Sequence, residues 1–332
     1  MKWRRIPDGF TLLELLVAMI ITLGLAGLML AVVTNTLGLW QRTQDNFSSS
    51  AQATLALDMI ERDLQAAAFR RDGGTWMAVD VISTPSVLTT HGWLTAGTTK
   101  PAGGESQRFL TDTAGSSVPT ISKARFGLSG AWVRFITTNV ESGGSLPIAV
   151  SYQIARRPLS GGITSGNPAA VRYTLFRAAV SAENTLASGN DVTVAGYGSA
   201  SVAPTASRAP ATLTNPNNTD ALATNVVDFG VWLYVRDPAG LRRIFPADNS
   251  DTVHAAHDTG SAPDVNRFPD VGEVMIRILT EHGATVLAEM ESGNGRVTRP
   301  AAYATDAEWW WAVAEANSHV YTRRVEVKGT AL

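Results

Sequence analysis

Histidine and aspartate side chains between residues 251 and 258 come closest to the spacing of a metal site. His254 and His257 are three residues apart, and Asp251 and Asp258 flank them. On a helix, two imidazoles at this spacing could share one metal ion. The surrounding segment, 248–270, contains glycine and proline and is predicted to be a loop. We therefore interpret both histidines as solvated loop residues and keep them as weak metal candidates, with no metal or cofactor expected.

Other catalytic chemistries have still less support in the residues. The chain has no cysteine, which excludes disulfides, thiol catalysis and thiolate metal sites. It contains neither a Walker-type phosphate loop nor a Gly-x-Ser-x-Gly nucleophile elbow. The triplet Asp228-Phe229-Gly230 occurs in kinases, but its companion motifs are missing here, so we assign it to the start of a strand. The sequence predicts that the protein is not an enzyme.

Composition favours a folded protein that does not bind nucleic acid. Of 332 residues, 45% are hydrophobic and 17% are charged, which suits one or two domains with a sizeable core. The 27 basic and 29 acidic residues give a net charge of −2. Without a basic surplus, the electrostatic attraction that nucleic-acid binding requires is missing.

The first forty residues have the pattern of a membrane anchor. Lys2, Arg4 and Arg5 precede an apolar run over 10–39 in which Glu14 is the only charge. At about 1.5 Å per residue, roughly 20 helical residues cross the hydrocarbon core of a bilayer. We expect one transmembrane helix, with the basic flank in the cytoplasm and the remainder beyond the inner membrane.

A secretory signal peptide or a plain signal anchor is the alternative for this segment. The apolar run is longer than a usual signal core, and no small-x-small cleavage site clearly follows it. Glu14 also argues against it: a carboxylate deep in lipid costs about 2.5–3.5 kcal/mol on insertion scales, and less near the interface, and Glu14 lies early in the run. Glu14 should therefore have a compensating partner.

The string from Gly9 to Leu15, Gly-Phe-Thr-Leu-Leu-Glu-Leu, resembles the prepilin peptidase site of type IV pilins and type II secretion pseudopilins. The resemblance implies that residues 1–9 are a leader, that the peptidase cuts after Gly9, and that Phe10 becomes the N-methylated terminus. It also implies that Glu14 pairs with a terminal amine, often a neighbour's, during assembly. Asp8, an acid beside the cut, departs from the family pattern.

Beyond the membrane, the helix is expected to continue as an amphipathic segment over 40–72. No proline interrupts the chain from Phe10 to Ala68, and Gly73 and Gly74 end the pattern. The expected contacts with the body involve Leu55, Ile60 and Leu64. The Ile-Glu-Arg-Asp-Leu sequence at 60–64 resembles the J-type minor pseudopilins of type II secretion. The alternative is an ordinary amphipathic helix with solvated charges.

The remaining chain, 73–332, has the pattern of a β-rich body, so the predicted class is α+β: a long N-terminal helix packed on an antiparallel sheet, as in pilins. Long loop insertions are expected near 96–119 and 181–223, and two short helices near the C-terminus. Short runs rich in valine, isoleucine and aromatic residues predict the strands. These are Val79–Leu88, Ala131–Thr138, Ala149–Arg156, Val171–Val180, Val226–Val235, Glu273–Leu279 and Val320–Lys328, with Leu241–Phe245 as a hairpin partner.

Three consecutive tryptophans, Trp309, Trp310 and Trp311, form the most unusual local feature. Three such side chains cannot all face the same way, so we expect one or two in the core; a partner surface is the alternative.

The tail around 321–325 also resembles prepilin-like proteins encoded in gene cassettes of Verrucomicrobia. This second resemblance covers mainly the two ends of the chain.

Three functions remain open from the sequence. The first is a minor pilin or pseudopilin, assembled with other pilin subunits into a pilus-like or pseudopilus structure or its tip. The second is a pilin-anchored binding or adhesin module at the cell surface, supported by the long loops. The third is a surface enzyme on a prepilin anchor, with His254 and His257 as its candidate site. The secretion or pilus system and the position in a filament are left open.

Overall fold

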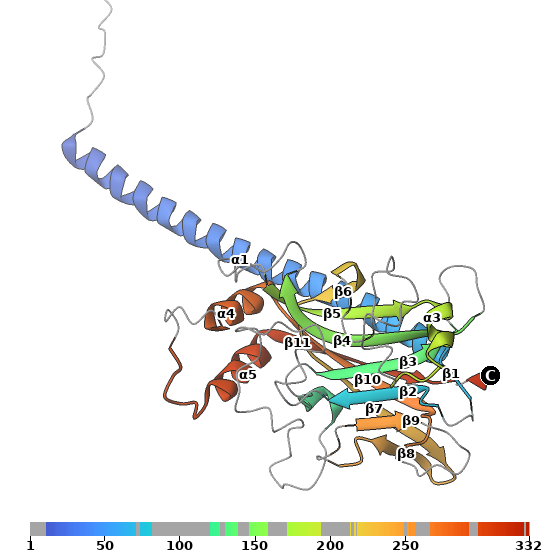
Figure 1. The fold of residues 1–332 in the computed structure, drawn as a ribbon. Coiled ribbons are helices and arrows are strands. Elements are labelled where there is room, and N and C mark those ends of the chain that lie inside the picture. The colour runs from blue at the N-terminus through green and yellow to red at the C-terminus, as the bar shows by residue number, and fades with distance from the viewer. Residues whose placement is uncertain are drawn as a thin grey trace, which may run out of the picture. The chain divides into compact units, whose positions relative to one another are not determined.

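The computed structural model describes residues 11–70, 74–81, 120–126, 130–138, 146–158, 171–193, 213, 216, 218–248, 251, 253–256, 266–291, 298–328 and 330–331. The chain divides into two compact units, Met1–Ser48 and Ser49–Leu332. The second unit contains both large sheets (Figure 1). It also contains the hydrophobic core.

Helix α1 runs over 54 residues, Leu12–Gln65, as the long apolar pattern predicts. It ends before the expected boundary near residue 72, because carbonyl groups at its C-terminal end accept hydrogen bonds from residues at the end of β3. The Thr138 backbone N–H donates to the Ala66 carbonyl at 2.9 Å, and the Thr137 hydroxyl donates to the Asp63 carbonyl at 3.0 Å. The chain then enters strand β1, Ala68–Phe69, which pairs in parallel with β12, Thr330–Ala331.

The larger sheet has six antiparallel strands in the order β6-β5-β4-β3-β2-β9. Its strands are β2 Met77–Val81, β3 Ala131–Thr137, β4 Ile148–Pro158, β5 Val171–Val180, β6 Ala221–Thr224 and β9 Val253–Ala256. The expected first strand, Val79–Leu88, thus begins two residues earlier, and residues 82–88 lie outside the described part of the chain. Strand β9 lies inside 248–270, so the expectation of a loop over that whole segment is wrong.

The smaller sheet has four antiparallel strands in the order β11-β10-β7-β8. They are β7 Val226–Asp237, β8 Gly240–Phe245, β10 Val271–Leu279 and β11 Ser318–Glu326. The predicted α+β class is confirmed, with antiparallel pairing in both large sheets. The division into two sheets, rather than one, was not predicted.

Short helices complete the body. They are η1 Ile121–Lys123, α3 Ala182–Ala187, η5 Asn218–Asp220, α4 Glu281–Glu291 and α5 Asp306–Ala316. The two C-terminal helices, α4 and α5, were predicted. The expected loop over 181–223 in fact contains α3, η5 and most of β6, while the other expected loop, 96–119, lies outside the described residues.

The second unit packs its core against one face of α1. Leu57, Ile60 and Leu64 are buried there, at helical spacing. A Cβ atom built on Gly272 of β10 would lie 3.6 Å from Leu64 Cδ1, so the helix passes close to the smaller sheet. Leu55, expected on this face, is 57% exposed. At about 100° per residue, it lies roughly 200° around the helix from Leu57 and faces away from the core.

Candidate functional site

Of the residues predicted to act in processing or assembly, the structure describes only Glu14, at the start of α1. Glu14 is the third residue of the helix, and Thr11 is the capping residue. The Thr11 backbone N–H and hydroxyl both donate to Glu14 Oε2 at 3.0 Å, and Glu14 N–H donates to Thr11 Oγ1 at 3.3 Å. This reciprocal pattern is a capping box. Gly9, Phe10, Lys2, Arg4 and Arg5 lie outside the described residues.

The capping box gives Glu14 partners within its own chain. The sequence signal was available, because threonine followed three residues later by glutamate before an apolar run is typical of a capping box. Sequence reasoning missed it by treating Glu14 only as a charge that needs a cation. The carboxylate accepts two hydrogen bonds without any second molecule.

The surface of α1 in the first unit is apolar and exposed from Leu12 to Leu39. By length and hydropathy, α1 is one helix that could cross a membrane. Its threonines satisfy their own hydroxyl groups: Thr22 donates to the Ala18 carbonyl at 2.7 Å, and Thr36 to the Val32 carbonyl at 2.8 Å. Such internal hydrogen bonds remove a cost that free hydroxyl groups would carry in lipid.

A buried ion pair attaches the end of α1 to the six-stranded sheet. Asp63 is fully buried, and its carboxylate accepts hydrogen bonds from Arg177 Nε at 2.7 Å and Arg177 Nη2 at 3.1 Å. The Tyr152 hydroxyl donates to the same carboxylate at 2.6 Å. Burial, and next the Asp63 charge, raises the pKa of Tyr152 well above its usual value, so this hydroxyl stays protonated.

The other face of the same helical turn reaches the smaller sheet. Arg323 on β11 pairs with Asp58 and, at 2.8 Å, with Glu61 Oε2. Within the motif at 60–64, Ile60 and Leu64 lie in the core. Asp63 binds the six-stranded sheet through Arg177, and Glu61 binds the four-stranded sheet through Arg323. The alternative of uniformly solvated charges is therefore wrong for Asp63.

His254 is a buried residue of β9, so its interpretation as a solvated loop residue is wrong. Its Nε2 atom lies 3.1 Å from the Arg267 carbonyl oxygen, and its ring lies 5.9 Å from the ring of Phe245. His257 is outside the described residues. Within the part of the chain that the structure describes, no three histidine, aspartate or glutamate side chains gather as metal ligands.

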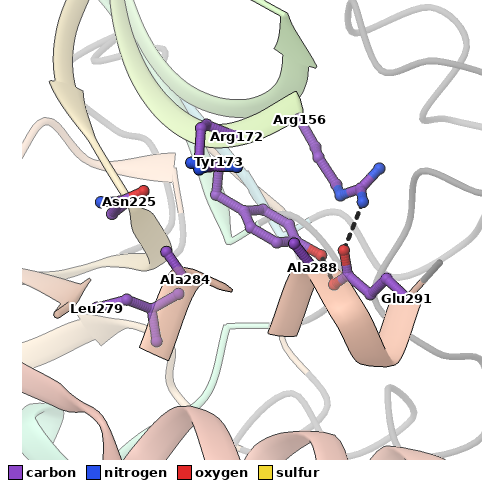
Figure 2. A pocket seen from close by; sticks show the side chains of 8 residues that line it. All are labelled: Arg156, Arg172, Tyr173, Asn225, Leu279, Ala284, Ala288 and Glu291. Carbon is purple, nitrogen blue, oxygen red and sulfur yellow. Dashed lines mark hydrogen bonds and ion pairs between the residues drawn. The ribbon is translucent and has the colours of Figure 1, made fainter. Parts of the chain in front are cut away.

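A second buried network surrounds Glu291 at the end of α4 (Figure 2). Arg156 Nη2 lies 2.6 Å from Glu291 Oε2, and Trp310 Nε1 donates to Glu291 Oε1 at 2.8 Å. The Tyr173 hydroxyl also donates to Glu291 Oε1, and burial, followed by the Glu291 charge, raises the pKa of Tyr173. The adjoining cavity of about 10 Å³ is about the size of one water molecule. The network therefore joins β4 and β5 to α4 and α5.

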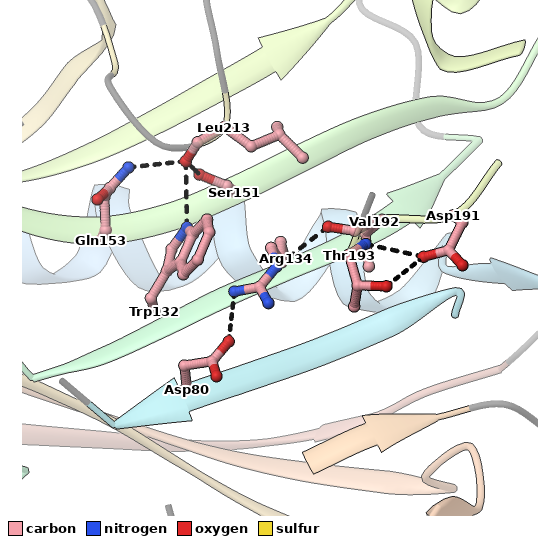
Figure 3. Close-up of polar contacts among 9 residues, drawn as sticks. All are labelled: Asp80, Trp132, Arg134, Ser151, Gln153, Asp191, Val192, Thr193 and Leu213. Carbon is pink, nitrogen blue, oxygen red and sulfur yellow. Dashed lines mark hydrogen bonds and ion pairs between the residues drawn. The ribbon is translucent and has the colours of Figure 1, made fainter. Parts of the chain in front are cut away.

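A third network holds connecting segments on the six-stranded sheet (Figure 3). Arg134 on β3 lies between Asp80, at 2.5 Å, and the Val192 carbonyl, at 3.1 Å. Burial lowers the pKa of Arg134. The Leu213 carbonyl accepts three side-chain hydrogen bonds, from Trp132 Nε1 at 3.1 Å and from Ser151 Oγ and Gln153 Nε2 at 2.8 Å. These hydrogen bonds hold the backbone at Val192 and Leu213 against β3 and β4, so we interpret them as structural contacts.

The tryptophan triplet lies on α5, and the expectation of one or two core residues is confirmed. Trp310 and Trp311 are 0% and 4% exposed, whereas Trp309 is half-buried. A capping box of Thr305 and Glu308 starts this helix.

Comparisons with known proteins add no assignment. No protein-family model matches the chain, and no curated protein or solved structure gives a significant match.

Proposed function

We propose that this chain is a prepilin-type structural subunit, a minor pilin or pseudopilin. In this proposal it is cut after Gly9 by a prepilin peptidase, N-methylated at Phe10 and assembled with other pilin-like subunits. Lys2, Arg4 and Arg5 hold the N-terminus in the cytoplasm, and the body lies beyond the inner membrane. The protein acts by assembly rather than by catalytic turnover.

The observation that carries the proposal is the position of Glu14. It is an acid at the third position of an exposed, apolar, membrane-length helix, five residues after Gly9. An ordinary signal anchor does not require an acid there. Cutting after Gly9 would create an ammonium group at Phe10, four residues before Glu14 in the sequence. That cation, from the same chain or a neighbour, can pair with Glu14 where the dielectric constant is low.

The attachments of the last turns of α1 to the two sheets support a structural role for the body. Asp63 binds Arg177 on β5, and Glu61 binds Arg323 on β11, so the last turns of the helix are joined to both large sheets. A force applied along α1 would reach the body through these pairs and the core around Leu64. This arrangement suits a subunit that is held and moved by its helix.

Processing is tested by mass spectrometry of the mature N-terminus, after co-expression with a prepilin peptidase. We expect a chain that begins at Phe10 and carries one methyl group. Gly9→Val should leave the precursor uncut, because a side chain at this position blocks close approach to the protease. Gly24→Val, at an open position in α1, is the control and should be cut normally. A mature chain that begins at Met1, or one cut beyond residue 30, would contradict the proposal.

Assembly is tested with two substitutions at Glu14. Glutamine can retain the capping-box hydrogen bonds but has no charge, whereas leucine loses both. If the charge pairs with a terminal amine, Glu14→Gln and Glu14→Leu should both be inserted and cut, yet neither should co-purify with pilin partners. If capping alone matters, only Glu14→Leu should lose partners. Normal recovery for both variants would remove Glu14 from the site.

A further inference from the structure

The outer edge of β11 is the longest regular unpaired strand edge among the described residues. β11 ends the four-stranded sheet, and its register with β10 continues through nine consecutive pairs without a shift. The edge strands β6 and β9 have four residues each, and β8 pairs with β7 through a bulge. Natural proteins often protect edges with prolines, bulges or very short strands. β11 has none of these three features.

The hydrogen-bond pattern shows which backbone groups of β11 point outward. Thr280 N–H donates to the Asn317 carbonyl at 2.8 Å, and Val327 N–H donates to the Asp270 carbonyl at 2.9 Å. These bonds flank the ladder and fix its alternation, so odd-numbered residues of β11 bond to β10. The N–H and C=O groups of the even-numbered residues therefore point away from the sheet. These are Ser318, Val320, Thr322, Arg324 and Glu326.

We propose that this edge pairs with the same edge of a second copy of the chain, antiparallel and centred on Thr322. The two four-stranded sheets then form one continuous sheet across a twofold axis. Five pairs of outward-facing residues each exchange two backbone hydrogen bonds. The surface lies wholly within the second unit and does not depend on the function proposed above.

The order of charged residues along β11 favours a second copy of the chain as the partner, and it favours this register. With Thr322 at the axis, all nine residues are paired, and no like charges lie opposite each other. The opposite pairs are Ser318 with Glu326, His319 with Val325, Val320 with Arg324, Tyr321 with Arg323, and Thr322 with its equivalent. Moving the axis by one residue to Arg323, or by two to Arg324, would place an arginine directly opposite its own copy, which is destabilising. Moving it to Tyr321 would leave the last two residues unpaired.

Single cysteines test the register in the full-length chain, in membranes or detergent. The chain has no native cysteine, so any disulfide reports the introduced residue. Thr322→Cys places two sulfurs across the axis, where the Cα atoms of a hydrogen-bonded pair are about 5.5 Å apart, a separation that suits a disulfide. We expect roughly tenfold more cross-linked dimer than for Arg242→Cys on β8, the other edge of the same sheet. Equal cross-linking at the two edges would overturn the proposal.

A second arm separates this pairing from chance collision. Ser318→Cys and Glu326→Cys should each give no disulfide-linked dimer alone, because each cysteine lies far from its own copy, but a mixture of the two should give a disulfide-linked heterodimer. Cross-linking of either variant with itself, or none in the mixture, would contradict the register.

Backbone blocking provides an independent measurement. Thr322→Pro removes an outward N–H without removing a hydrogen bond to β10, and Thr322→Val is the matched control that retains it. By native mass spectrometry, proline should raise the dimer dissociation constant by roughly tenfold or more over valine. A monomeric wild-type chain at all concentrations, or equal constants for both variants, would refute the pairing.

Discussion

Removal of the Asp63 carboxylate should destabilise the body strongly. Asp63→Ala would leave Arg177 as a largely buried cation, with 14% of its side chain exposed, and would deprive the Tyr152 hydroxyl of its acceptor. Breaking a buried ion pair by removing one partner costs about 3–5 kcal/mol. At roughly 2 °C per kcal/mol for a large domain, the melting temperature should fall by about 6–10 °C.

The assay is urea unfolding of the full-length chain in detergent, followed by fluorescence of the buried tryptophans. The free energy of unfolding should fall at an unchanged m-value, since the folded surface is the same. The double variant Asp63→Leu/Arg177→Met removes both charges and should recover part of the loss, because no unpaired buried charge remains.

An exposed pair gives the matched control for this experiment. Arg236 and Glu326 pair at 2.5 Å, but their side chains are 59% and 65% exposed. Arg236→Ala should therefore change the free energy of unfolding by less than about 1 kcal/mol. If Asp63→Ala costs no more than this control, the buried attachment of α1 to the six-stranded sheet is refuted.

Three further predictions concern the same unit. Leu64→Asp should unfold or strongly destabilise the body by burying a charge, whereas Leu55→Asp, on the exposed face of the same helix, should leave its melting temperature within a few degrees. Gly230→Ala should lower the free energy of unfolding by about 1–3 kcal/mol, because its Cβ would lie 2.0 Å from the Phe126 ring. Burial, and next a hydrogen bond to a glutamate on β10, raises the pKa of Tyr234 to about 12. The Tyr234 hydroxyl contributes to the free energy of unfolding below about pH 10, and this contribution is lost as pH rises through 12. In pH-dependent unfolding, Tyr234→Phe should therefore lose less stability than the wild-type chain over this range.

Local sequence patterns were sufficient to predict α1 and most strands, because each carries its own periodicity. The triplet at 228–230, assigned to a strand, lies in β7, where Gly230 leaves room for Phe126. Strand β9 has four residues, too few to give a clear pattern, and pairing with β2 decides its structure. The burial of His254 follows from that pairing and from no property of its neighbours in sequence.

The polar contacts that hold the body together could not be predicted in the same way. Asp63 and Arg177 are 114 residues apart in sequence, and Arg323 is 262 residues from Glu61. Nothing in a local pattern links such residues, since their meeting depends on sheet order and register. Amphipathic spacing predicted that the helix would have a buried face. The prediction that Leu55 lies on that face was wrong, because Leu55 is exposed about half a turn away from it.

The capping box changes what the position of Glu14 implies. An acid in an apolar helix suggested a missing cation, yet Thr11 already supplies two hydrogen bonds to the carboxylate. The cost of burying the acid therefore does not by itself require a neighbour's amine. The charge would matter if cutting after Gly9 places an ammonium group beside Thr11, where it would compete for the same carboxylate oxygens. Glutamine can maintain the cap but cannot attract that amine, so the difference between Glu14→Gln and Glu14→Leu measures which interaction assembly uses.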